Sequence, residues 1–416
     1  MGKMIGKKSH TDVSVYDASL ERIRDIFDRA DNVSVGFSGG KDSTVCLNLA
    51  LQVAREKKRT PLTVHFFDEE AIVPDTVDYV RRVSKIPGID LKWWCIPILH
   101  RNGCSRKEPY WYPWDPRKED IWTRPMPPEA LTVDDLPVDG FQLTYKGETH
   151  TKIPTINHLI EPESKGMNIH ITGIRADESM RRFQAVARRE VDNYFGNYEN
   201  YPYIMLAHPI YDWTDLDVWT AVNKLGWDYN TAYDRYRQMG ISTTKQRVAP
   251  PYGEEPMQAL HTFAKAWPEL WGKMSERVKG AATAARYSQT GLYAFNKRPV
   301  RNKERYPKPM DYIVYLIGKF PEDEQKLIAA SINQAIKYHR KESGNTRMLE
   351  SEANPKSGLC WETLYMIAMR GDLKNRKLAA IQAGVRSNAR KKSSPTTDKR
   401  SKVGRKRKTQ TKQLQP

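Results

Sequence analysis

The stretch Ser38-Gly39-Gly40-Lys41-Asp42-Ser43 combines the residue types that bind a phosphate group. Two adjacent glycines allow a sharp turn and a close approach of the backbone to a ligand. The serines add hydroxyls, Lys41 adds a cation, and the amides at the start of a following helix would point at an anion. The pattern predicts a phosphate or pyrophosphate site. The alternative is an ordinary turn in which Asp42 or Ser43 caps the helix.

The elements around this stretch predict an α/β fold. A β-branched run at 33–37 precedes the loop, and an apolar-periodic helix follows it. A lead-in helix is expected within residues 1–30, and further strands are expected at 62–68, 90–97 and 168–173, separated by a helix that starts at Pro74. Alternation of this kind predicts a mostly parallel sheet with helices on both faces.

Acidic residues close the second predicted strand, where ligands bind in open α/β sheets. We expect Asp68, together with Asp42, to hold Mg²⁺, or Asp68 to accept hydrogen bonds from ribose hydroxyls. The alternative is a solvated acidic turn, and it is stronger for Glu69 and Glu70 than for Asp68.

Arginines follow the strand that ends at Gly173. Arg175 and Arg182 are candidates for holding anionic oxygens, because the guanidinium group forms a bidentate fork. With Lys41 and Asp42 they make up the predicted catalytic set. The alternative is a helix start held by salt bridges.

These motifs resemble the PP-loop ATP pyrophosphatases. Asp68 with Pro74-Asp75-Thr76 matches the second motif of that superfamily, and the Gly-x-Arg-x-x-Glu-Ser-x-x-Arg run from Gly173 to Arg182 matches its phosphoadenosine phosphosulfate (PAPS) reductase and sulfurylase group. The resemblance implies an adenine nucleotide alpha hydrolase-like fold that binds ATP or PAPS, with Mg²⁺. The residues that it implies for the nucleotide are Ser38, Gly39, Gly40, Lys41, Asp42, Ser43, Asp68, Gly173, Arg175, Glu178 and Ser179.

The cysteines argue against thiol-based reduction of a sulfonucleotide. The four cysteines form no Cys-x-x-Cys pair, so a disulfide framework or an iron–sulfur cluster is not expected. The C-terminal catalytic cysteine of PAPS reductases has no match, since the context of Cys360 differs from theirs. The segment 208–219 resembles the family's region after its last strand, and there we expect Trp213 and Trp219 to be core residues.

The predicted organisation is a PP-loop domain at 31–225, a mostly helical domain at 226–384 and a disordered basic tail at 385–416. Residues 101–166 form an insertion rich in proline and aromatic residues, whose tryptophans either stack on bases or build a small core of their own. The helical domain resembles the C-terminal domain of unknown function in a bacterial PAPS-reductase-like subgroup that includes proteins labelled immunoglobulin-binding regulator A. That resemblance implies a ParB/sulfiredoxin-like protein partner.

Charge and hydropathy indicate which partners and which cellular location to expect. The net charge is +18, and the stretch from Arg386 onward holds twelve Lys or Arg against one Asp. Such a tail is a solvated end or a salt-sensitive contact with nucleic acid. No run is long and apolar enough for a membrane span and no signal peptide is recognised, so we expect a cytoplasmic protein without membrane contact.

Three functions follow from these patterns. The first is an ATP pyrophosphatase that adenylates an acceptor, with nucleic acid as a candidate for the molecule that carries it. The second is a PAPS-binding sulfur-transfer enzyme whose reductant comes from a partner. The third is a nucleotide-sensing regulatory or complex-forming protein without turnover.

Overall fold

The computed structural model describes residues 11–385 apart from 106–107, 109, 144–150, 152–155, 180–181, 184–185, 187–193, 198–200, 244–245, 250–259, 288–298, 346, 372–377, 380 and 383–384. The predicted basic tail at 385–416 therefore lies almost entirely outside the described residues. The chain forms two compact units, residues 1–294 and 295–416, and each is described by itself.

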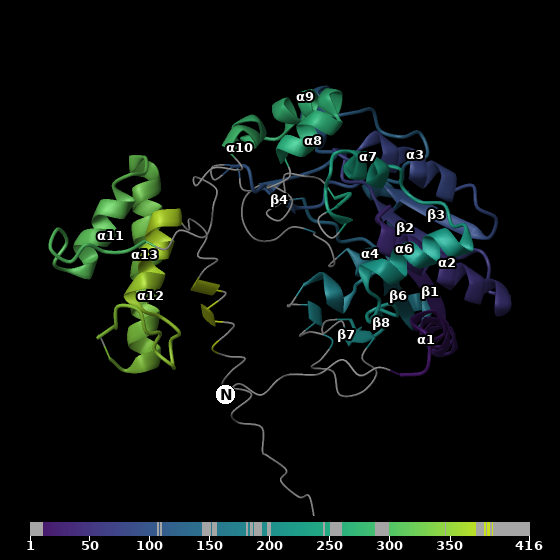
Figure 1. Ribbon diagram of the computed structural model, residues 1–416, viewed down its shortest axis with the longest axis horizontal. Helices are drawn as coiled ribbons and strands as arrows, with labels where there is room; N and C mark the ends of the chain where they lie inside the picture. Colours follow the sequence, from purple (N-terminus) through teal and green to yellow (C-terminus); the bar gives the residue numbers. More distant parts are fainter. Residues whose placement is uncertain are drawn as a thin grey trace, which may run out of the picture. The chain divides into compact units, whose positions relative to one another are not determined.

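A six-stranded sheet forms the centre of the first unit (Figure 1). Its strand order is β3-β2-β1-β6-β8-β7. All neighbouring strands run parallel except β7 and β8. The strand bounds are β1 Asn32–Gly36, β2 Leu62–Phe67, β3 Ile89–Trp94, β6 Asn168–Thr172, β7 Phe195–Asn197 and β8 Ile204–Ala207. This confirms the mostly parallel α/β sheet that the sequence predicts.

The register aligns the carboxyl ends of the central strands. Val35 of β1 lies opposite Val64 of β2 and Ile171 of β6, and all three side chains enter the same hydrophobic core. Helices α1 (Val15–Arg29), α2 (Lys41–Glu56), α3 (Pro74–Val83) and α6 (Asp215–Leu225) contribute to that core. The segments that leave β1, β2 and β6 therefore emerge at one sheet edge.

A second core covers the opposite face of the sheet. Trp94, Ile96 and Ile98 pack there against the short helix α4 (Asn157–Ile160). Because side chains alternate between faces along a strand, Trp94 points away from the core that Trp93 enters.

The insertion uses its tryptophans as packing groups. Trp111, at the end of the β4–β5 hairpin (His100–Arg101 and Tyr110–Trp111), and Trp114 are 5% and 2% exposed. The Trp114 ring lies edge-on to Trp122, with 5.1 Å between centroids, and its indole N–H donates to the Asp68 carbonyl. These tryptophans are therefore not an exposed stacking surface, but the prediction of a small core of their own is also wrong: Trp114 and Trp122 join the core of the sheet, and Trp111 packs with Trp267 and Met274.

Four helices after residue 226 belong to the same unit as the sheet. They are α7 (Ala232–Gln238), α8 (Leu260–Ala266), α9 (Pro268–Arg277) and α10 (Ala281–Tyr287). The sequence predicts one helix over 258–272, but Pro268 begins a new helix because proline fits the first helical position and lacks an amide donor. The compact unit thus continues past residue 226. The division into two domains at that residue stays a prediction.

A fully buried ion pair ties α9 to the end of β2. Both Arg277–Glu70 contacts, Nε to Oε1 and Nη2 to Oε2, measure 2.9 Å. Glu70 also accepts hydrogen bonds from the backbone amides of Trp114 and Thr123. Glu70 is therefore an internal anchor and not the solvated acid that the sequence favours.

The second unit is helical in the part that the structure describes. Helices α11 (Pro309–Ile317), α12 (Glu322–Ser343) and α13 (Trp361–Arg370) share one apolar core and are drawn in green to yellow in Figure 1. The sequence analysis missed α11, which is apolar over most of its length. No helix among the residues described meets the length and hydropathy that crossing a bilayer requires.

Side chains of β1, β2 and β6 form a buried polar network with Glu161. The Ser34 hydroxyl and the His170 Nδ1 atom both contact Glu161, and Ser34 Oγ lies 2.8 Å from His170 Nδ1. The Trp94 indole N–H donates to His65 Nδ1 at 3.0 Å, which leaves His65 Nε2 facing Glu161 at 3.6 Å. Burial lowers the pKa of His65 from 6.5 to about 4, so this imidazole is neutral in the folded protein near pH 7.

We expect this network to make stability depend on pH. Because the pKa of His65 is lower in the folded protein, the unfolded chain takes up this proton at a higher pH than the folded protein does. The contribution of neutral His65 to stability is therefore complete above pH 6.5 and is lost as the pH falls toward 4. Replacing His65 with Gln removes one titrating group. It should reduce the slope of the free energy of unfolding against pH by up to about 1.4 kcal/mol per pH unit. Denaturant unfolding at pH 7, 6 and 5 measures this. Identical slopes for the wild type and His65→Gln would contradict it.

We expect Arg277→Met to destabilise the first unit by about 3–5 kcal/mol, because it leaves the Glu70 carboxylate buried and unpaired. Arg82→Met is the matched control. Arg82 donates two hydrogen bonds to the Asp228 carboxylate, at 2.7 and 3.1 Å, but both side chains are about half exposed. Arg82→Met should therefore lower the free energy of unfolding by less than about 1 kcal/mol. Denaturant unfolding measures both variants, and equal losses of unfolding free energy would contradict the greater contribution expected of the buried pair.

Candidate functional site

The loop between β1 and α2 has the compact form that its glycines predict. Gly39 has φ +71°, and a Cβ there would lie 2.8 Å from a Thr76 methyl. Gly40 is the N-cap of α2. The Ser38 and Ser43 hydroxyl oxygens lie 3.1 Å apart, and the Ser43 hydroxyl donates to the Gly40 carbonyl at 2.9 Å. The two serines thus hold the turn closed from inside.

Gly173 brings the end of β6 against the start of α2. A Cβ built on Gly173 would lie 2.8 Å from the Asp42 carbonyl carbon and 2.8 Å from the Ser43 amide nitrogen. Both are backbone atoms, which cannot yield as a flexible side chain can. Glycine is needed here for close packing, and the contact joins the two predicted motifs directly.

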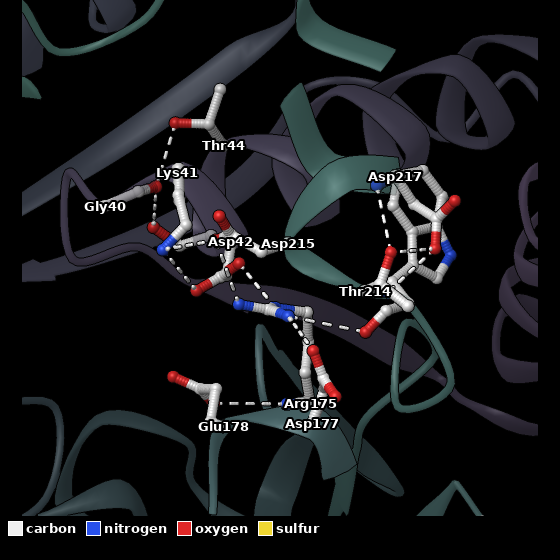
Figure 2. Close-up of polar contacts among 12 residues, drawn as sticks. Gly40, Lys41, Asp42, Thr44, Arg175, Asp177, Glu178, Thr214, Asp215 and Asp217 are labelled. Atoms are coloured by element: carbon white, nitrogen blue, oxygen red, sulfur yellow. Dashed lines mark hydrogen bonds and ion pairs between the residues drawn. The ribbon is translucent and has the colours of Figure 1, made fainter. Parts of the chain in front are cut away.

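Four charged side chains meet at this junction (Figure 2). Arg175 Nε donates to Asp42 Oδ1 at 2.7 Å, and the Lys41 ammonium lies 3.3 Å from Asp215 Oδ1. Lys41 and Arg175 are also 3.8 Å from Asp42 Oδ2 and 3.7 Å from Asp215 Oδ1, respectively. The Lys41 and Arg175 side chains are only 3% and 4% exposed. The cations of the first and third motifs therefore converge on one spot.

The two cations face three carboxylates, because Arg175 Nη1 also lies 3.9 Å from Asp177 Oδ2, whose side chain is 47% exposed. Asp215 Oδ1 is buried without a hydrogen bond among the described residues. Its negative charge is compensated by the ion pairs with Lys41 and Arg175. The N-terminus of α2, at Lys41, adds amide donors to the same region.

Comparison with known families identifies the sheet domain. Residues 32–103 and 139–246 match the phosphoadenosine phosphosulfate reductase domain, and residues 240–357 match a domain of unknown function, DUF3440. The chain carries a PAPS reductase domain. The first of these matches includes the loop, Arg175 and Asp215, and the second begins after α7.

Three individual proteins illustrate what the chain is similar to. The uncharacterized protein YbdN of Escherichia coli (strain K12) is 28% identical over 322 residues, which is 74% of this chain and 76% of that protein. The PAPS reductase of Candida auris, solved as a phosphate complex, is 16% identical and matches 55% of this chain and 94% of its own, with a TM-score of 0.27. The FMN adenylyltransferase of Candida glabrata in complex with ATP is 13% identical, over 56% and 63% of the chains, with a TM-score of 0.32.

The remaining predicted residues of the PAPS reductase domain lie around this cluster rather than in it. The Glu178 carboxylate accepts from the Arg175 backbone amide at 3.3 Å and pairs with Arg182. The Ser179 hydroxyl accepts from the Arg182 amide. The Arg182 side chain is 42% exposed and is not among the ion-pair partners of Asp42 or Asp215 in the described structure.

Asp68 of the PAPS reductase domain is held by protein donors. It is 2% exposed, and its carboxylate accepts from the Trp93 indole at 2.7 Å, the Glu70 amide at 2.9 Å and the Arg124 guanidinium. No group of three or more His, Cys, Asp or Glu that suits a metal ion occurs within the described part of the chain. A magnesium site on Asp42 and Asp68 stays a prediction.

Sequence reasoning missed Asp215 in the charge cluster. The pattern Thr214-Asp215 read as a helix start, and Thr214 does cap α6 by accepting from the Asp217 amide. The missed signal is that Asp215 is the first helical residue, at the edge where the sheet's carboxyl ends emerge. Asn230, before α7, and Tyr233, within it, also reach the loop, and the sequence analysis gave neither a role in the site.

We expect Gly173→Ala to lower stability by about 1–3 kcal/mol and to disturb the loop, because the new methyl group meets backbone atoms of α2. Gly272→Ala makes the same change inside α9, where nothing lies within 4 Å of the added methyl, so it should be neutral or stabilising by up to about 1 kcal/mol. Thermal unfolding of both variants tests this. A Gly173→Ala protein as stable as Gly272→Ala would refute the close packing.

Proposed function

We propose that the protein binds ATP with its phosphates on residues 38–43 and cleaves it between the α- and β-phosphates to adenylate an acceptor. The observation that carries this proposal is the convergence of Lys41 and Arg175, both almost fully buried, at the N-terminus of α2. Buried cations that are not needed to hold a helix together are poised for an anionic ligand. The match to the PAPS reductase domain supports an adenine nucleotide as that ligand.

The proposed reaction needs no proton transfer when the acceptor is an anionic oxygen, such as a phosphate or carboxylate. The acceptor oxygen attacks the α-phosphorus, and the electron pair of the α–β bridging bond leaves with pyrophosphate. Charge grows on the oxygens around the α-phosphorus and on the leaving group. Lys41 and Arg175 would stabilise that charge, because they are fixed in a buried setting before the reaction begins.

Magnesium enters the proposal through Asp42. Mg²⁺ is commonly bound by one or two carboxylates together with substrate phosphates, and Asp42 would become available when a phosphate takes Arg175 from it. The metal would offset phosphate charge. Because the Asp68 oxygens already accept from three donors, Asp68 fits a structural role better than a ligand role.

The acceptor and the partners belong to the proposal as well. The basic tail, with +11 of the total charge of +18, supports an acceptor on nucleic acid or in a complex with it. The resemblance to the regulator A subgroup supports a ParB/sulfiredoxin-like partner. A cytoplasmic location goes with the use of ATP.

The activity test uses the full chain with ATP, Mg²⁺ and nucleic acid. We expect AMP and pyrophosphate as products, and we expect Lys41→Ala to reduce their formation at least 100-fold, because it removes a buried cation from the leaving phosphates. Lys57→Ala is the control: that lysine lies at the end of α2 and pairs with Asp28, away from the loop. Release of ADP and phosphate instead, or an unaffected Lys41→Ala variant, would contradict the proposal.

The family match itself favours a second candidate, PAPS as the bound nucleotide with a reductant from a partner. The four cysteines are buried, and burial raises the pKa of Cys46, Cys95 and Cys104, so they lack the thiolate character of a sulfur nucleophile. Competition calorimetry decides between the nucleotides: tighter binding of PAPS than of ATP favours this candidate. ATP binding without product under any condition would favour a regulatory protein.

A further inference from the structure

The segment that leads into α7 packs directly on the phosphate loop. Asn230, 1% exposed, donates its side-chain amide to the Gly39 carbonyl at 3.0 Å and to the Thr76 hydroxyl at 2.7 Å. Its side-chain oxygen accepts from the Ala232 amide and so fixes the start of α7. Asn230 therefore ties the start of α7 to the loop, although 191 residues separate Asn230 from Gly39 in sequence.

Tyr233, on the first turn of α7, reaches the beginning of α2. Its hydroxyl oxygen accepts the Lys41 backbone N–H at 2.9 Å. That amide is one of the four at a helix start that have no partner within the helix and that bind anions in phosphate sites. In this structure the Tyr233 oxygen thus occupies a position that a phosphate oxygen takes at such a terminus.

The same hydroxyl borders Gly40, the N-cap of α2. A Cβ added to Gly40 would lie 3.2 Å from the Ser38 hydroxyl oxygen and 3.4 Å from both the Tyr233 hydroxyl oxygen and a Val248 methyl group. Two hydroxyls and one methyl group therefore flank the side of Gly40 that lacks a side chain. The Lys41 ammonium lies 5.7 Å from the Tyr233 ring centroid.

The Tyr233 phenol is neutral and can donate a hydrogen bond. Burial raises the pKa of Tyr233 well above its usual value, so its proton stays on at neutral pH. A tyrosine hydroxyl has one proton to donate besides its acceptor capacity. Among the described residues the Lys41 amide is its hydrogen-bond partner, which leaves that proton for a ligand. The ring is held edge-on by Trp219, with 5.3 Å between centroids.

We propose that Tyr233 is a phosphate-binding residue of the nucleotide site, donating its hydroxyl proton to an oxygen of the phosphate chain beside Gly40. This inference rests on the proposed function, because it names a further contact to the same ligand. The hydroxyl accepts from the Lys41 amide and donates to the phosphate. It thus links the amide at the start of α2 to the phosphate through one bridging group. Its contribution should fall on the phosphates and not on the nucleoside.

Isothermal titration of the full chain with ATP and with adenosine tests the proposal. Tyr233→Phe keeps the ring and removes the hydroxyl, and we expect it to weaken ATP binding about 10- to 100-fold, the range for a hydrogen bond to a charged group. Adenosine binding should change less than about twofold. Thermal unfolding of the ligand-free variant confirms that α7 remains folded.

Tyr236→Phe is the matched control, because it makes the same change one turn further along α7. The Tyr236 hydroxyl donates to the Arg247 carbonyl at 2.8 Å and has no contact with the loop, so ATP affinity should stay within about threefold of the wild type. ATP binding by Tyr233→Phe that equals the wild type, or equal losses for ATP and adenosine, would overturn this inference alone. Failure of the wild type to bind ATP would overturn the proposed function and this inference with it.

Discussion

The contact of Gly173 with the backbone of Asp42 and Ser43 is the constraint on which the site depends. It fixes the end of β6 against the first turn of α2 at van der Waals distance. Arg175, two residues later, then has a short path to the Asp42 carboxylate. The approach thus brings Lys41 and Arg175, which come from different strand ends, to the same pair of carboxylates.

Buried ion pairs are the second organising feature of the first unit. Glu70 and Arg277 tie α9 to the segment after β2, while Lys41 and Arg175 pair with Asp42 and Asp215 at the loop. A buried pair that loses one member leaves an uncompensated charge, so we expect both sets to resist substitution. The two sets differ in their hydrogen bonds. Glu70 also accepts from backbone amides of the insertion, whereas Asp215 Oδ1 has no hydrogen bond among the described residues.

Local pattern accounts for the parts of the fold that sequence reasoning predicted. The strand, glycine loop and helix around Lys41 read directly from periodicity, and the rule that parallel strands end at one edge predicted that Arg175 would meet Lys41. The missed parts depend on distant packing. Strand β7 lies at the sheet edge and, like its neighbour β8, is short; helix α11 is apolar over most of its length; and Tyr233 reaches the loop from a helix far along the chain. Arg182 and Asp68 belong to motifs, yet their recorded charge partners lie outside the cluster.

The placement of the carboxylates explains how the site can hold charge with and without an anion. Asp42 lies in the first turn of α2, and Asp215 is the first residue of α6. The positive end of a helix dipole stabilises a carboxylate in its first turn by about 0.3–1 kcal/mol. When phosphate oxygens take Lys41 and Arg175, each carboxylate keeps that helix contribution. In the proposed nucleotide complex the exchange of partners would therefore cost less than it would if the two carboxylates had no helix terminus beside them.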